Sequence, residues 1–345
     1  MADTTMGAEL VATIEEARVL ASSGEVRSAI DVLSQANRAQ RRAELEVELV
    51  RLRRGAAASR VGTTPGARPR ISAEPGDDCV FEIDAGELSA RSVRSGLARS
   101  GCVLVRGLVP PHRAESLAVG IDTALAAGDA AATGEEVDPG WYSPGSMPDR
   151  VSGGLPEDAN RRFLRERGGM WTADSPHMLF ELFETVDAVG IGALMTEFLG
   201  ERPFLSAHKC TLRRVPPDLV VMGGWHQDGS FLGNDIGAFN LWLSLSHCGR
   251  DAPGLDIVPK RVERVLPSDE EARFDWSLSD AAVNAAADGA PIVRPEFRPG
   301  DALLFDHLLV HRTATSPEMT QQRHAIESWF FAPSAWPVGQ IPILY

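Results

Sequence analysis

Four residues in the C-terminal half of the chain are of types and spacings that could do chemistry: His226, Asp228, His311 and Arg323. In an extended strand, residues two apart point to the same side, so His226 and Asp228 could bind one metal ion while Gln227 turns away. Two imidazoles and one carboxylate can occupy one face of an octahedral ion and leave the other face open, as in iron(II) oxygenases that lack haem. An arginine on a neighbouring strand could then bind the far carboxylate of a keto-acid cosubstrate.

Such a site needs a scaffold of short strands, and the second half of the sequence predicts one. Expected strands cover residues 204–215, 220–226, 238–246, 255–258, 302–305 and 325–332. Clusters of glycine, proline and aspartate separate them. Many short strands with such turns favour a jelly roll or barrel over a βαβ fold. Because helices come first and strands follow, we predict an α+β chain whose core is a double-stranded β-helix.

The first part of the chain is expected to be helical. Apolar residues recur at spacings of three and four in residues 8–54, with a break at Ser22-Ser23-Gly24, which predicts two helices. Their sequence resembles one helical hairpin of the tetratricopeptide kind. A single such hairpin cannot bury its own apolar face. We therefore expect it to pack on the main domain, to pair with a second copy in a homo-oligomer, or to dock a partner.

Composition then divides the chain into three parts. We predict an N-terminal helical hairpin, a flexible linker rich in Ala, Gly, Pro and Arg, and a double-stranded β-helix domain, over residues 1–54, 55–78 and 79–345. Further helices are expected within the last part, at 87–99, 113–127 and 179–199. Residues 128–168 are rich in Gly, Pro and Asp and could form a lid over a substrate, with Trp141-Tyr142 as a pocket cover.

Charge and cysteine content limit the class of protein. The chain has 34 basic and 48 acidic residues, for a net charge of −14, which argues against nucleic-acid binding because that requires a basic surface. Apolar runs are too short to cross a bilayer, and the N-terminus lacks the basic and apolar segments of a secretion signal. Four cysteines without CxxC spacing are expected to be free, mostly buried thiols. We predict a cytoplasmic protein without nucleic-acid or membrane partners.

Beyond the His226-Gln227-Asp228 segment, three further stretches follow a recognisable order, giving four in all at residues 101–108, 225–231, 254–259 and 300–326. In this order they resemble the phytanoyl-CoA dioxygenase family over roughly residues 80–335. The resemblance implies a dioxygenase that uses iron(II), 2-oxoglutarate and O2. Such an enzyme would hydroxylate a C–H bond of a small or medium organic substrate and release succinate and CO2.

The same resemblance assigns roles to six residues. The iron ligands, and thus the catalytic residues, would be His226, Asp228 and His311. The 2-oxoglutarate contacts would be Arg323, helped by Thr313, and the aromatic Trp242.

Two features depart from the family pattern, and one further histidine competes for a ligand role. Lys260-Arg261-Val262 stands where the family usually has Gly-Ser-His, and the interval from His311 to Arg323 is one residue longer than expected. His307, four residues before His311, is an alternative ligand. Arg312 and His324 should face away from the site, because each adjoins an inward-pointing residue on a pleated strand.

Basic residues elsewhere in the sequence do not identify the substrate. Arg213-Arg214 and 260–264 are expected on a solvated face, or alternatively they attract an anionic or carrier-linked small-molecule substrate. Two other classes of function also stay open. One is a non-catalytic jelly-roll binding or scaffold protein, and the other is a cupin-type hydrolase or isomerase that uses another metal.

Overall fold

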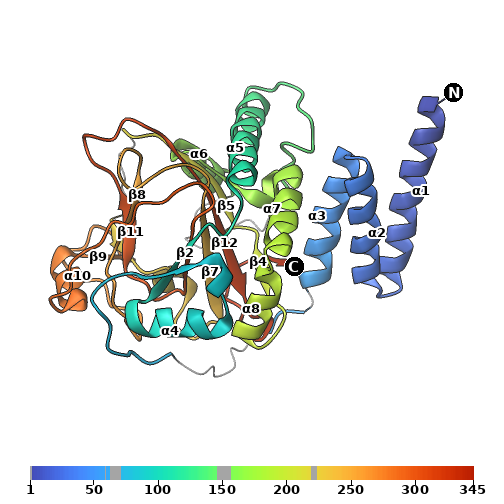
Figure 1. Cartoon of the computed structure of the whole chain (residues 1–345). Helices are drawn as coiled ribbons and strands as arrows, with labels where there is room; N and C mark the ends of the chain where they lie inside the picture. Colours follow the sequence, from blue (N-terminus) through green and yellow to red (C-terminus); the bar gives the residue numbers. More distant parts are fainter. Residues whose placement is uncertain (1, 59, 63–70, 146–156, 219–223) are drawn as a thin grey trace.

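The computed structural model describes residues 2–58, 60–62, 71–145, 157–218 and 224–345. Two β-sheets form the core of these residues, helices cover the outer side of the larger sheet, and three N-terminal helices stand in a row at one end (Figure 1). The predicted α+β chain built on a double-stranded β-helix is confirmed.

Nine strands form the large sheet of the described chain. Along the sheet they are β1 (Phe81–Asp84), β2 (Cys102–Arg106), β10 (Ala302–Phe305), β7 (Ala238–Ser244), β12 (Arg323–Phe331), β4 (Phe204–Ser206) and β13 (Pro342–Leu344), with β5 (Thr211–Val215) beside β12 and β3 (Gly169–Trp171) beside β5. All pairs are antiparallel except β1 with β2. The predicted strand 204–215 is two strands, because residues 207–210 turn between β4 and β5.

The small sheet has the order β8 (Gly254–Ile257), β11 (His311–Ala314), β6 (Trp225–His226) and β9 (Ser277–Leu278). It lies against one face of the large sheet, which we call the inner face. Leu255 and Ile257 of the small sheet share a buried cluster with Ala325 and Trp329 of β12. Side chains alternate along a strand, so the residues between them, such as Ile326, belong to the outer face.

Four helices cover the outer face. They are α4 (Ala90–Ser100), α5 (Pro111–Ala132), α7 (Pro176–Ala188) and α8 (Ile191–Leu199), and their leucines and valines pack on the outer-facing residues of the strands. We predicted a single helix over 179–199. The structure has two, because Gly190 adopts a left-handed conformation with φ of 72° and ends the helical path. Gly200 ends α8 in the same way, as predicted.

Shorter elements complete the described fold. They are α6 (Glu157–Glu166), α9 (Gly229–Leu232), α10 (Asp280–Ala287) and three 3-10 turns at Ala85–Glu87, Thr172–Asp174 and Pro333–Ala335.

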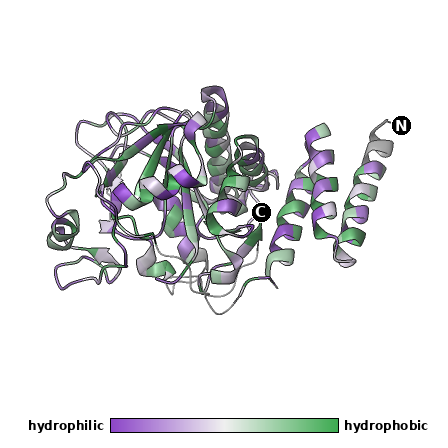
Figure 2. Ribbon diagram, turned by 60° about the horizontal axis from the view of Figure 1, so that its bottom comes forward, coloured by the Kyte–Doolittle hydropathy of each residue, from purple (hydrophilic) through white to green (hydrophobic). Residues whose placement is uncertain are grey.

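The N-terminal region forms three helices rather than the predicted two: α1 (Ala2–Ser22), α2 (Val26–Ala39) and α3 (Ala43–Ala58). Helix α3 runs past residue 54 and packs on the main domain, where the Glu46 carboxylate lies 3.2 Å from His177 Nδ1 of α7 and Arg53 donates to the carbonyl of Leu344 in β13 at 2.8 Å. Helix α1 is the farthest from the sheets (Figure 1). Hydrophobic positions gather in the central strands, whereas the three helices carry both kinds of residue (Figure 2).

Part of the predicted linker lies on the main domain. Arg261 Nε donates to the Ile71 carbonyl at 3.1 Å, and the Glu74 N–H donates to the Ala98 carbonyl at 2.9 Å. Arg261 also forms an ion pair of 2.7 Å with Asp306 and is buried. The expectation that Arg261 is solvated was therefore wrong. Residues 59 and 63–70 of the predicted linker lie outside the described residues.

Membrane insertion has no candidate element among the described helices, because none combines the length and the apolar composition that a bilayer span requires.

Candidate metal centre

His226, Asp228 and His311 lie together between the two sheets. Their candidate ligand atoms are all within 4.8 Å of one another, and His311 Nε2 is 3.7 Å from Asp228 Oδ2. The two imidazole rings have centroids 4.5 Å apart. Among the described residues, this is the group of His, Cys, Asp and Glu side chains close enough to hold one metal ion.

Strand pairing positions the two histidines. His226 ends β6 and His311 begins β11, and the two residues are direct partners across the antiparallel pair. Partners of this kind project to the same face of a sheet. Asp228 reaches the same point differently from our prediction. It does not continue a strand but has helical φ and ψ of −62° and −24° and precedes helix α9.

Gln227 turns away from the site, as predicted, and fixes the loop between the two ligands. Its amide nitrogen donates to the Leu308 carbonyl at 2.6 Å and to the Arg264 carbonyl at 3.2 Å. Its amide oxygen accepts from the Leu266 N–H at 2.7 Å. Since Gln227 is fully buried, these bonds to three backbone groups hold His226 and Asp228 in a defined position.

His307, the alternative ligand, does not join the group. Its Nε2 lies 3.0 Å from the Asn234 carbonyl, and its own carbonyl accepts from the Gly229 N–H at 2.8 Å. A side chain at Gly229 would meet Val265 at 2.5 Å and this carbonyl at 3.0 Å. His307 therefore supports the turn that follows Asp228.

The hydrogen bonds of the two imidazoles favour metal binding through Nε2. Nδ1 of His226 lies 3.2 Å from the Gly224 carbonyl, and Nδ1 of His311 lies 3.1 Å from the Leu309 carbonyl. Donation from Nδ1 to a carbonyl leaves Nε2 unprotonated and fixes the ring, as is usual for histidines that bind metals. Burial and the neighbouring His311 lower the pKa of His226 to about 4, so the ring is neutral at neutral pH.

Asp228 is held ionised by its surroundings. Burial acts to raise its pKa, but Lys209 and the two imidazoles act against this and the net shift is downward. Lys209 Nζ lies 3.3 Å from Asp228 Oδ1 and 3.7 Å from the centre of the Phe231 ring. The turn that brings Lys209 to Asp228 leaves no local signal in the sequence.

These donors fit a divalent transition metal. Two neutral imidazoles and one carboxylate form the facial set that suits iron(II). With metal–ligand bonds of about 2.0–2.2 Å, two ligand atoms on one ion can be no more than ~4.4 Å apart. Small side-chain rotations therefore suffice to bring atoms that now lie within 4.8 Å onto a single ion.

Arg323 offers a cationic group for a cosubstrate. It begins β12, is 2% exposed, and donates from Nη1 to the Gly254 carbonyl at 3.0 Å. Its Nε has no hydrogen-bond partner among the described residues, and neither has the indole N–H of Trp242. The guanidinium carbon lies 5.5 Å from the centre of the Trp242 ring. Unpartnered buried donors are rare in proteins, so this pair is suited to an anionic ligand.

Thr313 lies two residues after His311 on β11, so it projects to the same face as that ligand. Arg312, between them, points the other way as predicted: it bonds Asp256 at 2.9 Å and lies over Trp225. His324 also faces away as predicted and contacts Asp122 of α5 at 3.0 Å. The alternation of side chains along the two strands therefore directs Arg312 and His324 away from the site, as expected.

The expected pocket cover is not found over the metal centre. Trp141 packs on His177, with ring centroids 4.1 Å apart, beside α5 and α7. Much of the predicted lid, residues 146–156, lies outside the described residues.

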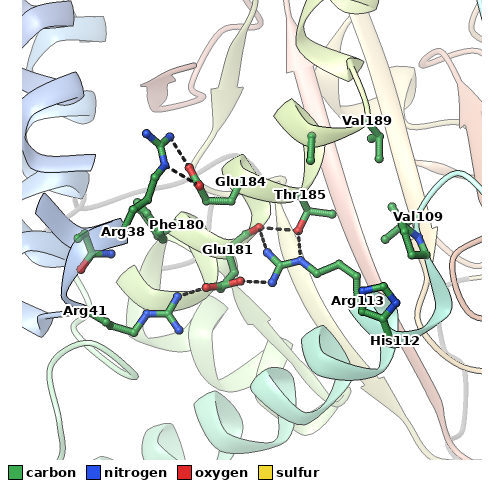
Figure 3. Close-up of a pocket in the computed structure, with 13 residues that line it drawn as sticks. Arg38, Arg41, Val109, His112, Arg113, Phe180, Glu181, Glu184, Thr185 and Val189 are labelled. Atoms are coloured by element: carbon green, nitrogen blue, oxygen red, sulfur yellow. Dashed lines mark hydrogen bonds and ion pairs between the residues drawn. The ribbon is translucent and has the colours of Figure 1, made fainter. Parts of the chain in front are cut away.

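A pocket of about 610 Å³ lies between α2 and α7, away from the metal centre (Figure 3). Its charged side chains pair with one another: Arg38 with Glu184 at 2.7 Å, and both Arg41 and Arg113 with Glu181. Because these charges already satisfy each other, we interpret the pocket as the junction of the N-terminal helices with the main domain.

Comparisons with known proteins agree with this fold. The family model described as phytanoyl-CoA dioxygenase (PhyH) matches residues 97–325. EctD from S. alaskensis, crystallised with 2-oxoglutarate and 5-hydroxyectoine, is 18% identical with a TM-score of 0.52, over 79% of this chain and 86% of that one. Its apo form is 17% identical with a TM-score of 0.52, over 85% of this chain and 91% of that one. AviO1 from Streptomyces viridochromogenes Tue57 is 19% identical, with a TM-score of 0.47, over 72% and 98%. No curated protein matches the sequence.

Proposed function

This chain belongs to the phytanoyl-CoA dioxygenase family, and from that premise we propose that it is an iron(II)- and 2-oxoglutarate-dependent oxygenase that hydroxylates a C–H bond of a small or medium organic molecule. His226, Asp228 and His311 would hold the iron, and Arg323, Trp242 and Thr313 would hold 2-oxoglutarate. The observation that carries the proposal is the grouping of the three candidate ligands within 4.8 Å. The buried Arg323 on the neighbouring strand adds to it.

When bound, iron(II) and 2-oxoglutarate would supply the oxidising power for C–H hydroxylation, with O2 consumed and succinate and CO2 released. The residues of this chain would bind iron(II) and 2-oxoglutarate, orient them and shield them from water. Arg323 would fix the far carboxylate of 2-oxoglutarate through the paired N–H donors of its guanidinium. Lys209 keeps Asp228 ionised, and Gln227 holds the ligand loop in place. Phe305 and Trp329 keep water from one side, since the Phe305 ring lies 5.1 Å from His311 and 5.9 Å from Trp329.

The test is spectroscopic as well as kinetic. Iron(II) and 2-oxoglutarate added without oxygen should give a weak visible charge-transfer band, and turnover in air should form succinate. His226→Ala should abolish both. His247→Ala is the matched control, because His247 is exposed and outside the group. The proposal is wrong if the wild-type protein gives no band, or if His226→Ala forms succinate normally.

The alternative metal-dependent hydrolase or isomerase is tested in the same experiment, because its product formation would not require oxygen. The scaffold alternative predicts no succinate at all. A cytoplasmic location is also part of the proposal, supported by the three buried free thiols at Cys102, Cys210 and Cys248.

A further inference from the structure

An ion pair on the inner face, close to the metal centre, has no role in the site described above. Glu327 and Thr211 are direct partners across β12 and β5, and Thr211 Oγ1 donates to Glu327 Oε2 at 2.9 Å. Arg213 Nε donates to Glu327 Oε1 at 3.2 Å. The side chains of Arg213 and Glu327 are 22% and 24% exposed, whereas Ala325 and Trp329, their neighbours on this face, are buried. This polar cluster is therefore partly accessible, unlike the residues beside it.

The cluster lies between the parts of the proposed site. Glu327 follows Arg323 by four residues on the same face of β12, about 13 Å along an extended strand. It interacts electrostatically with both Arg323 and Asp228. Burial acts to raise the pKa of Glu327, but Arg213 and Thr211 lower this pKa by more than burial raises it. The net shift is downward and keeps the carboxylate ionised.

Folding alone does not explain this pair. Taking two charges even partly out of water offsets much of what their attraction returns, so such an ion pair often stabilises a fold no more than apolar residues of equal size. The flanking positions on this face are apolar and well packed. Charged residues at Arg213 and Glu327 therefore indicate recognition of a polar ligand.

The donors that remain on Arg213 define the chemistry of that ligand. A guanidinium has five N–H donors, and the bond from Nε to Glu327 uses one of them while fixing the plane of the group. The two terminal nitrogens then present paired donors, the arrangement that matches a carboxylate or phosphate. Glu327 and Thr211 act as positioning residues for Arg213.

The charge around the metal centre agrees with an acidic ligand. Three cationic side chains (Lys209, Arg213 and Arg323) interact there with two carboxylates (Asp228 and Glu327). The cations Arg54 and Arg161 act on the adjacent His208, whose pKa they and burial lower to about 4, and Arg161 is paired with Asp174. The charges of iron(II) and of 2-oxoglutarate cancel, so the excess of positive charge remains. A negative group on the substrate would reduce it.

We propose that Arg213, held in place by Glu327 and Thr211, binds an acidic group of the substrate, so that the oxygenase acts on an organic acid bearing a carboxylate or a phosphate. This inference rests on the proposed function, since it assigns the substrate class of the same site.

The test uses the full chain loaded with iron(II) and 2-oxoglutarate under anaerobic conditions, and calorimetric titration with chemically matched probes. Hexanoate, octanoate and decanoate are compared with their methyl esters, with alkyl phosphates of the same length and with the corresponding alkylamines. We expect acids to bind and esters and amines to bind at least tenfold more weakly. The carboxylate and phosphate series show which acid the site takes. Equal binding of acids and esters, preference for amines, or binding of no acid would overturn the proposal.

Variants assign the effect to Arg213. Arg213→Gln should weaken binding of the acid by roughly 10- to 100-fold, the loss of one charge-assisted contact. Glu327→Gln can still accept the hydrogen bond that positions Arg213 but removes the competing negative charge, so it should tighten binding of the acid roughly two- to fivefold. A purely structural ion pair would give both variants the same loss. The control is Arg214→Gln on the opposite face of β5, where Arg214 bonds Asp122 at 3.2 Å, and it should bind as the wild type does.

The charge-transfer band separates this inference from the proposed function. Arg213→Gln should keep the band of the wild type, since it lies outside the proposed iron and 2-oxoglutarate contacts. A wild-type protein that gives the band but shows no preference for acids refutes the acid-binding site alone. A protein without the band refutes the oxygenase itself.

Discussion

Replacing Arg323 by methionine is expected to stabilise the metal-free protein while weakening 2-oxoglutarate binding. Arg323 is 2% exposed, burial lowers its pKa, and its Nε has no hydrogen-bond partner among the described residues. The protein without cosubstrate therefore carries the cost of a buried charge. Methionine has a similar length and no charge. Replacing a buried ion pair by apolar residues often adds about 1–4 kcal/mol to the free energy of unfolding, and we expect a gain in the same range from removing the charge of Arg323.

The size of the thermal shift follows from the chain length. An unfolding entropy of about 2.1 cal/mol/K per residue gives about 0.7 kcal/mol/K for 345 residues. One kcal/mol then corresponds to ~1.4 °C in Tm, so Arg323→Met should raise the Tm of the metal-free protein by roughly 1–6 °C. The opposite effect is expected for the cosubstrate, whose Kd should rise about 10- to 100-fold.

Calorimetric melting of the metal-free proteins measures the first effect, and melting with and without 2-oxoglutarate, at saturating iron(II) and without oxygen, measures the second. A concentration one hundred times the wild-type Kd adds about 2.7 kcal/mol of stability, or ~4 °C. The same concentration should add only about 0.4–1.4 kcal/mol to the variant. Arg323→Lys is the control that keeps the charge. A metal-free Arg323→Met protein that melts below the wild type would refute the reasoning, because Arg323 would then be a structural residue.

Three further results are expected. Gln227→Leu should lower the free energy of unfolding by roughly 2–4 kcal/mol, because one buried and two partly buried backbone groups lose their hydrogen bonds. Urea unfolding measures this loss, and an unchanged midpoint contradicts the role given to this side chain. Gly229→Ala should lower stability by about 1–3 kcal/mol through the contacts at 2.5 and 3.0 Å, and should weaken iron binding in a chelator competition. Removing residues 1–24 should leave the charge-transfer band intact, whereas removing residues 1–58 should abolish folding, since the buried leucines of α3 contribute roughly 5–9 kcal/mol; circular dichroism separates the two.

The β-sheet core could be predicted because its strands follow a local rule. Short apolar runs with Gly, Pro and Asp between them mark most strand positions, and alternation along β11 and β12 predicts the outward direction of Arg312 and His324. Both directions are confirmed. Five short strands were not among those expected: β1, β3, β9, β11 and β13. The two-residue strand β9 (Ser277–Leu278), for example, has no apolar run.

The N-terminal region was harder because its third helix is stabilised from outside. Helix α3 buries Glu46 and Glu48, which makes its sequence look exposed. Glu46 is satisfied by Asn37 and His177, and Glu48 by Arg18 and Arg51. Arg51 lies one turn away on the same helix, but Asn37, His177 and Arg18 belong to other helices and cannot be deduced from the periodicity of α3.

Some residues around the metal centre could be predicted from the sequence, and others could not. The grouping of His226, Asp228 and His311 could be anticipated from residue types and order, although the helical backbone of Asp228 could not. Lys209 and Glu327 reach the site because β4, β5 and β12 pair side by side. Their place depends on tertiary contacts that a single sequence does not reveal, and their roles stay proposals.

The pairing of β6 with β11 has a consequence for stability. The two strands share one residue pair, and that pair is His226 with His311. An ion bound by both imidazoles would act as a cross-link at the point where the small sheet has the least backbone hydrogen bonding. Removing the ion with a chelator would then weaken the pairing of β6 with β11, so the stability of the small sheet would depend on its metal content.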